Sequence, residues 1–349
     1  MTAAQVFDGH NDVAFRLYEG RSGDPVKDFL EGRGGHVDLP KARAGGLVGG
    51  FFALWAPSDE KLDLSGMRGA SYDVPLPAAL DRGRAAAAIS TQLALLLNLS
   101  ERSEGALALC QSTGEIRQAV DRGSVAMLLH LEGADAIDAD LDELHRLHAA
   151  GLRSLGPVWS RPTIFGHGVP LRFPASPDTG PGLTDAGHRL VATCNELGIL
   201  IDLAHMNEKG FWDVARLSDA PLVATHSNAH TLSPTPRNLT DRQLAAIRES
   251  AGVVGVNFAT AYLRPDGQMS PDTALDWVVR HLDHLIDRLG EDGVALGSDY
   301  DGAVVPEAIA TAAELPVLIA RLRSSGYDQS LVTKICFENW MSVLARTID

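Results

Sequence analysis

Short apolar runs alternate with longer amphipathic stretches along this chain, and this alternation constrains the fold more than any other feature of the sequence. Eight runs have the length and composition of strands, at residues 5–13, 47–56, 124–132, 152–159, 199–206, 221–227, 252–258 and 294–300. Helix-like stretches lie between them, including 85–99, 141–150, 185–197 and 275–289. Strands that alternate with helices are typical of βα units and a parallel sheet.

The number of these units favours a closed barrel. Eight strand–helix units within 349 residues match an α/β fold of the (β/α)₈ TIM barrel type, whereas a doubly wound open sheet gives no reason for eight. The chain has no internal repeat and no Ser/Pro-rich linker, so we expect a single domain over residues 1–349. The Gly- and Pro-rich stretches 57–77 and 161–182 are expected to be long loops at the active-site face.

Composition and charge exclude several classes of protein. Lys and Arg number 30 and Asp and Glu number 45, which gives a net charge of −15. Such acidity disfavours nucleic acids and anionic membrane surfaces as partners. No apolar run approaches the ~18 residues of a membrane helix, the N-terminus has no signal-peptide pattern, and three scattered cysteines give no disulfide framework. We therefore expect a cytoplasmic protein that binds neither nucleic acid nor membrane.

Metal-capable side chains stand where five of the apolar runs end, which is where a barrel of this kind builds its active site. They are His10 and Asp12, Glu132, His205, His226, and Asp299. The His-x-Asp spacing puts an imidazole and a carboxylate on one side of a strand, which suits zinc. Each of these residues alone also fits an ion pair or a structural histidine. Together they predict a metal site.

The remaining histidines near these positions are expected to have other roles. His130 lies one layer deeper than Glu132, as a supporting or core residue. Two pairs, His145/His148 and His281/His284, fall on amphipathic helices without a third ligand, so we expect them at the surface.

The size of the ligand set predicts two metal ions. One catalytic zinc uses three protein ligands, and this chain offers six candidates. A carbamylated lysine bridges the metals in many two-metal barrel hydrolases, but none of the lysines lies on a predicted strand: they are Lys27, Lys41, Lys61, Lys209 and Lys334. Glu132 is therefore predicted to bridge two Zn²⁺ ions that carry an attacking hydroxide. Asp299 is predicted to be the general acid and base, with Asp301 as the second candidate.

The same residues resemble the membrane (renal) dipeptidase family of the amidohydrolase superfamily. The resemblance is carried by Asp8-Gly9-His10-Asn11-Asp12, Glu132-Gly133, His226-Ser227-Asn228 with Arg237-Asn238, and the stretches 252–258 and 297–302. It implies that one zinc takes His10, Asp12 and Glu132, and the other takes Glu132, His205 and His226. It also implies a dipeptide substrate, a homodimer, and a role for Arg237 in holding the substrate carboxylate, which a guanidinium grips in two places.

The chain departs from the mammalian members of that family after the fourth predicted strand. Trp159 stands where those members have a histidine that contacts the substrate. We expect Trp159 to form an apolar wall, and His167, which lies between two glycines of the following loop, to reach the substrate instead. The alternative is that Trp159 is ordinary packing and His167 a solvated loop residue.

The function predicted from these residues is that of a binuclear zinc dipeptidase, with three alternatives. A deacylase of N-acyl amino acids would use the same metals and the same Arg237. A nucleoside deaminase on a related barrel would use one metal and would not need Glu132 as a bridge. A metal-binding or regulatory protein on an inactive barrel should have lost a ligand or the acid/base residue, and all six positions are intact here.

Overall fold

Parallel strands form the centre of the protein, in two sheets. The computed structural model describes residues 4–20, 23–58 and 62–349. The larger sheet runs β1 (Val6–Asn11), β2 (Leu47–Trp55), β5 (Val125–Glu132), β6 (Leu152–Gly156) and β8 (Leu200–Ile201), and β4 (Leu107–Cys110) pairs with the first half of β5. The smaller sheet runs β11 (Val294–Leu296), β10 (Val253–Val256) and β9 (Val223–Ala224).

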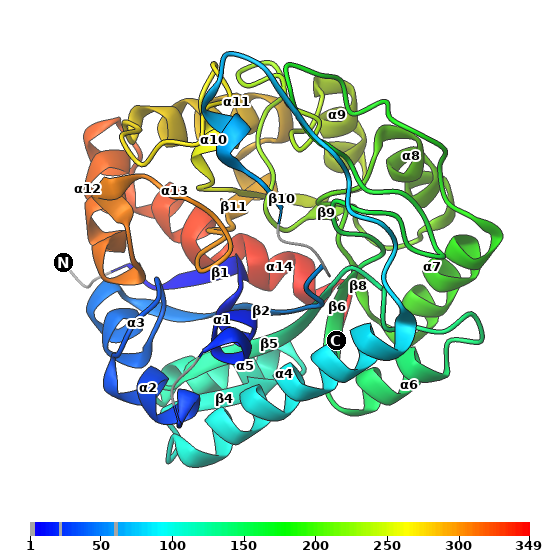
Figure 1. The fold of residues 1–349 in the computed structure, drawn as a ribbon. Helices are drawn as coiled ribbons and strands as arrows, with labels where there is room; N and C mark the ends of the chain where they lie inside the picture. The colour runs from blue at the N-terminus through cyan, green and yellow to red at the C-terminus, as the bar shows by residue number, and fades with distance from the viewer. Residues whose placement is uncertain (1–3, 21–22, 59–61) are drawn as a thin grey trace.

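Isolated parallel bridges link the two sheets at both edges. Asn11, at the end of β1, bridges to Tyr300, and Asp202, just after β8, bridges to Val223 of β9. The strands therefore curl around a common interior, with their carboxyl ends at one face (Figure 1). This curled parallel sheet confirms the predicted mixed α/β class.

Helices surround the strands (Figure 1). They are α1 (Val13–Glu19), α2 (Pro25–Glu31), α3 (Leu39–Gly45), α4 (Arg82–Arg102), α5 (Thr113–Asp121), α6 (Asp142–Ala149), α7 (Asp185–Leu197), α8 (Glu208–Leu217), α9 (Asp241–Glu249), α10 (Thr260–Leu263), α11 (Asp276–Leu289), α12 (Leu315–Ser324), α13 (Gln329–Thr333) and α14 (Asn339–Ala345). Several begin at a side-chain cap, as α9 does at Thr240, where a capping box with Gln243 satisfies free backbone donors. Across the described ranges, none of the helices combines the length and the apolar character needed to span a membrane.

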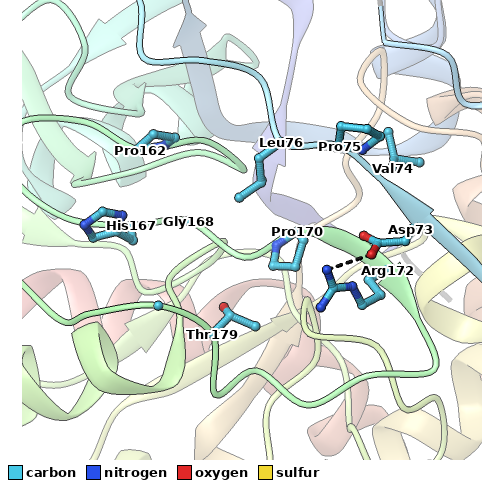
Figure 2. Close-up of a pocket in the computed structure, with 11 residues that line it drawn as sticks. Asp73, Val74, Pro75, Leu76, Pro162, His167, Gly168, Pro170, Arg172 and Thr179 are labelled. Atoms are coloured by element: carbon cyan, nitrogen blue, oxygen red, sulfur yellow. Dashed lines mark ion pairs between the residues drawn. The ribbon is translucent and has the colours of Figure 1, made fainter.

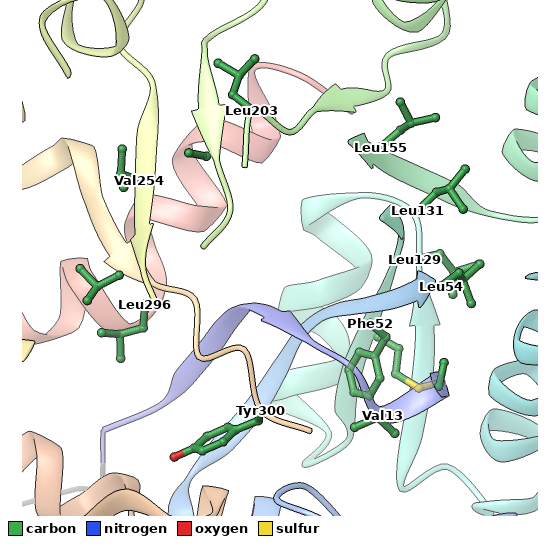
Figure 3. Packing of buried hydrophobic residues seen from close by; sticks show 14 of the residues in the cluster. Val13, Phe52, Leu54, Leu129, Leu131, Leu155, Leu203, Val254, Leu296 and Tyr300 are labelled. Carbon is green, nitrogen blue, oxygen red and sulfur yellow. The ribbon is translucent and has the colours of Figure 1, made fainter. Parts of the chain in front are cut away.

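Apolar residues pack on both sides of the strands, because a curled sheet must bury both of its faces. Inside, Phe7, Phe51, Leu200 and Val253 meet Trp340 of α14. The Trp340 indole donates a 2.9 Å hydrogen bond to the carbonyl of Leu296. Outside, the larger cluster fills the space between strands and helices, and Figure 3 shows members of it on strands of both sheets.

The two stretches expected to be long loops contain short strands that pair with each other. Strand β3 (Tyr72–Val74) lies antiparallel to β7 (Leu171–Phe173), with Tyr72 opposite Phe173. Their side chains form a small apolar cluster of their own with Met67 and Ala261. Residues 59–61 of the first stretch, and Lys61 with them, lie outside the described residues.

Each of the eight predicted runs contains a strand, but most of these strands end earlier than predicted. His205 and Asp299 follow β8 and β11 in left-handed backbone conformations, with φ values of 65° and 61°. Such residues cannot continue a β-ladder. Beyond β8 the Asp202 carboxylate accepts the backbone N–H groups of Ala204 and Thr225, which replaces ladder bonds with side-chain bonds. Asp12, His205, His226 and Asp299 therefore stand after the strands, whereas His10 and Glu132 lie within the last residues of β1 and β5.

Candidate metal centre

Glu132, the last residue of β5, lies at the middle of a group of histidines. Its Oε1 is 3.0 Å from Nε2 of His205 and 3.5 Å from Nε2 of His226, while its Oε2 is 3.7 Å from Nε2 of His10. His10 Nε2 is in turn 3.5 Å from Oδ2 of Asp12. The structure thus brings together all five predicted metal ligands, and each carboxylate oxygen of Glu132 faces a different part of the group.

Hydrogen bonds to the far ring nitrogen aim two of these histidines at Glu132. The Ser160 hydroxyl lies 2.9 Å from Nδ1 of His205, and the Thr225 hydroxyl lies 2.8 Å from Nδ1 of His226. Thr225 also donates a 2.6 Å hydrogen bond to Asp202. Such outer partners fix the ring orientation of a ligating histidine. Sequence reasoning missed Ser160, Thr225 and Asp202 as positioning residues, although each lies within three residues of a predicted ligand or strand end.

Burial and charge set the protonation of the group. Burial lowers the pKa of His205 and of His226 well below the ordinary value, so both rings are neutral. Burial also acts to lower the pKa of His10, but Glu132, Asp12 and Asp299 raise it to about 10. Burial raises the pKa of Glu132. Three carboxylates that share one buried space need cations beside them.

The residues present fit divalent metal ions. Two sets of side chains hold their ligand atoms within 4.8 Å of one another: His10 with Glu132 and His226, and His10 with Asp12 and Asp299. His10 is fully buried, and neither of its ring nitrogens has a hydrogen-bond partner among the described residues. Gly302 leaves the space open, since a Cβ there would lie 2.1 Å from Oδ2 of Asp12. Imidazole and carboxylate ligands of this kind suit zinc.

The two aspartates after β11 differ in what they contact. Asp299 accepts a 2.9 Å hydrogen bond from the Asn257 amide, and burial raises its pKa. Asp301 accepts hydrogen bonds from Nε of Arg16 at 3.0 Å and from the backbone N–H of His36 at 2.6 Å. The Asp301 carboxylate is therefore occupied in holding a loop, and Asp299 is the one that shares a potential metal set.

Arg237 is buried beside the same histidines. Its Nη2 donates a 3.1 Å hydrogen bond to the His226 carbonyl, and its guanidinium lies 5.2 Å from the centre of the Tyr262 ring. Its Nε has no hydrogen-bond partner in the part of the chain that the structure describes. A buried cation with a free donor next to the metal ligands is suited to an anionic group of a substrate.

A cavity of about 630 Å³ opens over this group. Asp12, Glu132, His205, Asp299 and Trp159 are among the residues that line it. Much of the remaining wall is apolar and includes Phe15, Trp55, Met67, Leu171 and Tyr262. The volume suits a small molecule.

A sequence profile of the family described as "Membrane dipeptidase (Peptidase family M19)" matches residues 1–348. The chain belongs to this family. It is therefore a hydrolase of the metallo-dipeptidase class, as the sequence predicted.

Two solved structures agree with membership of the dipeptidase family. The chain is 52% identical to a metallo peptidase from Rhodobacter sphaeroides liganded with a phosphinate mimic of the dipeptide L-Ala-D-Ala, with a TM-score of 0.97 over 99% of this chain and 100% of that one. It is also 52% identical to a structure described as dipeptidase AC, with a TM-score of 0.96 over 99% of each chain. An uncharacterized protein in the pqqA 5′ region of Klebsiella pneumoniae is 53% identical over 72% of this chain and 93% of its own.

His167 lies apart from the metal ligands in this dipeptidase-family chain. It lines a second cavity of about 490 Å³, together with Leu76, Pro162 and Thr179, as Figure 2 shows. Its backbone bridges to Pro162 across the loop that follows Trp159. Among the described residues that line the metal cavity, His167 does not appear. Its predicted reach to a substrate remains a prediction.

Two other histidine predictions have clear outcomes. His130 is fully buried and lies beneath the site, with Nδ1 2.9 Å from the Ser154 hydroxyl, as a supporting role requires. The surface position predicted for His281 is wrong. This residue shares the buried face of α11 with Val278 and Leu285, and its ring bridges two backbone segments.

Proposed function

We propose that this chain hydrolyses the peptide bond of dipeptides at a centre of two zinc ions bridged by Glu132, with Asp299 as general acid and base. The observation that carries the proposal is the position of Glu132, whose Oε1 faces His205 and His226 while its Oε2 faces His10. A carboxylate held in this way can be shared between two cations.

The ligand assignment is the one that the resemblance to the family implies. His10, Asp12 and Glu132 would hold one ion, and Glu132, His205 and His226 the other. The described lysines make ion pairs away from the cavity, so none competes with Glu132 as a bridge. When bound, the two ions supply polarisation of the scissile carbonyl and a water activated at neutral pH.

Asp299 and Arg237 complete the proposed chemistry. Asp299 would accept a proton from the attacking water and deliver it to the leaving amine, which are the two tasks of a general acid and base. Its hydrogen bond from Asn257 fixes one carboxylate oxygen and leaves the other for this role. Arg237 would grip the free carboxylate of the dipeptide with its unpaired donor.

A closed (β/α)₈ barrel of one domain is part of this proposal. The bridges from Asn11 to Tyr300 and from Asp202 to Val223 support closure, since they join both edges of the larger sheet to the smaller one. The order around the interior would then be β1, β2, β5, β6, β8, β9, β10 and β11. A homodimer, implied by the family resemblance, is tested by sedimentation of the purified protein.

The substrate class rests on the cavity and on a related structure. Because the R. sphaeroides metallo peptidase holds a mimic of L-Ala-D-Ala, we propose that dipeptides with a D-residue at the C-terminus are accepted here. Steady-state rates on L-Ala-D-Ala, L-Ala-L-Ala, N-acetyl-D-Ala and L-Ala-D-Ala amide test this. We expect the free dipeptides to be cut far faster than the amide, because the amide lacks the negative charge of the C-terminal carboxylate that Arg237 would bind. Cleavage of the N-acetyl compound alone would establish the deacylase instead.

A further inference from the structure

Arg161 is a buried cation that the chemistry proposed above leaves without a role. Its side chain is fully buried. Its guanidinium forms a two-point pair with Asp135, from Nε to Oδ1 at 2.8 Å and from Nη2 to Oδ2 at 3.1 Å. It also donates to the Ala56 carbonyl at 2.6 Å and to the Ser58 hydroxyl at 3.1 Å. Of these three partners, Ser58 lines the metal cavity, whereas Asp135 and Ala56 do not.

These contacts tie together the carboxyl ends of three neighbouring strands. Trp55 at the end of β2 lies opposite Glu132 of β5, and Glu132 lies opposite Gly156 of β6. Ala56, Asp135 and Arg161 follow these strand ends within a few residues. One guanidinium therefore holds the three segments that surround Glu132, at the edge where the cavity begins.

The same guanidinium lies against two indole rings that line the cavity. It is 5.5 Å from the centre of the Trp55 ring and 5.3 Å from that of Trp159, and the two rings are 5.0 Å apart in an edge-to-face arrangement. Both tryptophans line the metal cavity. Cation–π contacts of this kind are stronger when they are shielded from water. Arg161 thus holds the position of both rings from behind.

Gly133 makes this arrangement tight. Its φ of +84° favours glycine, and a Cβ there would lie 2.7 Å from Oδ2 of Asp135 and 3.2 Å from the backbone nitrogen of Trp159. The Asp135 carboxylate and the Trp159 backbone therefore pack directly on the residue that follows Glu132. The packing on this side therefore leaves no free space into which the ion pair could move.

Stability alone is a weak reason for such an arrangement. A buried ion pair repays little of its desolvation cost, and apolar replacement of both partners is often neutral or stabilising. If apolar residues replaced both Arg161 and Asp135, the directed hydrogen bonds of the guanidinium to the three segments would be lost. The attraction of the cation for both indole rings would be lost as well. These interactions fix geometry rather than add free energy of folding.

We propose that Arg161 is a positioning residue that fixes Trp55 and Trp159 as one apolar wall, against which a side chain of the dipeptide packs. The inference rests on the dipeptidase function proposed above. Because Arg161 is fully buried, it does not touch the substrate itself. The wall selects apolar side chains over glycine, since each extra methylene packed on a fixed surface favours the larger substrate.

The test compares selectivity rather than activity. The double variant Arg161→Met/Asp135→Leu removes both charges and leaves no unpaired buried carboxylate. For the wild type and this variant, kcat/KM is measured on L-Leu-D-Ala against Gly-D-Ala, and on L-Ala-D-Leu against L-Ala-Gly, so that each substrate position is varied. We expect the preference for leucine at one position to fall at least about tenfold in the variant, with Tm kept near the wild-type value. Loss of thermal stability alone would move all four rates together.

A matched control and a second variant complete the experiment. Arg117 pairs with Glu338 through both carboxylate oxygens and lies 5.4 Å from the Phe337 ring centre, but it is exposed. Arg117→Met/Glu338→Leu should leave both selectivity ratios unchanged. If the Arg161 double variant does not fold, Arg161→Lys, which keeps the charge but not the fork, is measured on the same four substrates and should show the same fall.

The outcomes separate the two proposals. A wild type that cuts none of the four dipeptides overturns the proposed function, and this inference with it. An active wild type whose leucine preference survives within twofold in a folded Arg161 variant overturns the inference alone, and Arg161 is then only a structural residue.

Discussion

The side-chain amide of Asn257 donates a 2.9 Å hydrogen bond to Oδ2 of Asp299. Asn257 follows β10 and is itself held by a reciprocal pair of hydrogen bonds with Asn228, the second residue after His226. The candidate acid/base is therefore anchored to the same loop that carries the candidate metal ligand His226. Asp301, by contrast, is bound by Arg16 and by backbone N–H groups of residues 36 and 37.

Asp299→Asn tests which of the two aspartates moves the proton. An amide cannot accept a proton at neutral pH, so we expect kcat to fall by at least ~10²-fold, the scale of a positioned acid/base. Metal content, measured by elemental analysis, should stay at the wild-type level. Asp301→Asn is the matched control, with a lower Tm from the weakened contact with Arg16 and a much smaller change in kcat. The reverse pattern would assign the proton shuttle to Asp301.

Glu132→Gln tests the bridge. Because the two carboxylate oxygens face different histidines, an amide at this position should weaken both metal sites at once. We expect the wild type to bind two ions per chain and the variant to lose both together in a titration with a competing chelator. Glu19→Gln, a carboxylate at the wall of the same cavity, should keep both ions. Independent loss of one ion, or active wild type with a single ion, would contradict the bridge.

The sequence was sufficient to predict eight of the strands and the side chains that gather at their ends, because both follow simple spacing. The runs that contain β1 and β5 end at His10, Asp12 and Glu132, and parallel strands bring such ends to one edge. The residues that aim the ligands were not predictable in this way. Ser160 and Thr225 resemble any loop hydroxyl, and only tertiary structure reveals that they meet Nδ1 of His205 and of His226. Arg161 is likewise defined by partners from two distant segments.

Three misjudged features show where local pattern is weaker. Strand β4 was not predicted, since its four residues pair only with the first half of β5 and leave the other half to β6. The strands that end at Ile201 and Leu296 were predicted to continue to residues 206 and 300, although left-handed backbone at His205 and Asp299 interrupts both runs. The burial of His281 could have been predicted, as it follows Val278 by three residues on one helix face.

His167→Ala tests whether the loop after Trp159 reaches the substrate. His167 lines the second cavity and not, among the described residues, the metal cavity. A direct donor to the substrate would cost roughly 10²-fold or more in kcat/KM on removal. From the position of His167 we expect a change below a few-fold, with both metal ions retained. A loss of 10²-fold at full metal content would show that the loop closes on the substrate and carries His167 with it.

His281 should make the free energy of unfolding depend on pH. The Ala229 N–H donates to its Nδ1 at 3.1 Å, and its Nε2 lies 3.0 Å from the Leu263 carbonyl, so the neutral ring supports the loop that follows His226. Burial lowers its pKa from 6.5 to about 4. The unfolded chain therefore binds a proton on this ring below about pH 6.5, whereas the native state does so only near pH 4. The contribution of His281 to the free energy of unfolding is fully present above pH 6.5 and is lost as the pH falls towards 4. Between pH 7 and pH 5 this one group should remove about 2 kcal/mol.

The measurement is urea unfolding of the metal-free wild type and of His281→Gln across that range. The absence of metal avoids release of the ions on acidification, and both proteins share the pH dependence that the buried His205 and His226 contribute. Glutamine cannot be protonated, so the variant should be less stable than wild type at pH 7 but should lose less of its stability on acidification. His145→Gln, an exposed histidine on α6, serves as the control and should follow the wild-type curve. Parallel curves for the wild type and His281→Gln would mean that the buried ring is already protonated in the native state at pH 5.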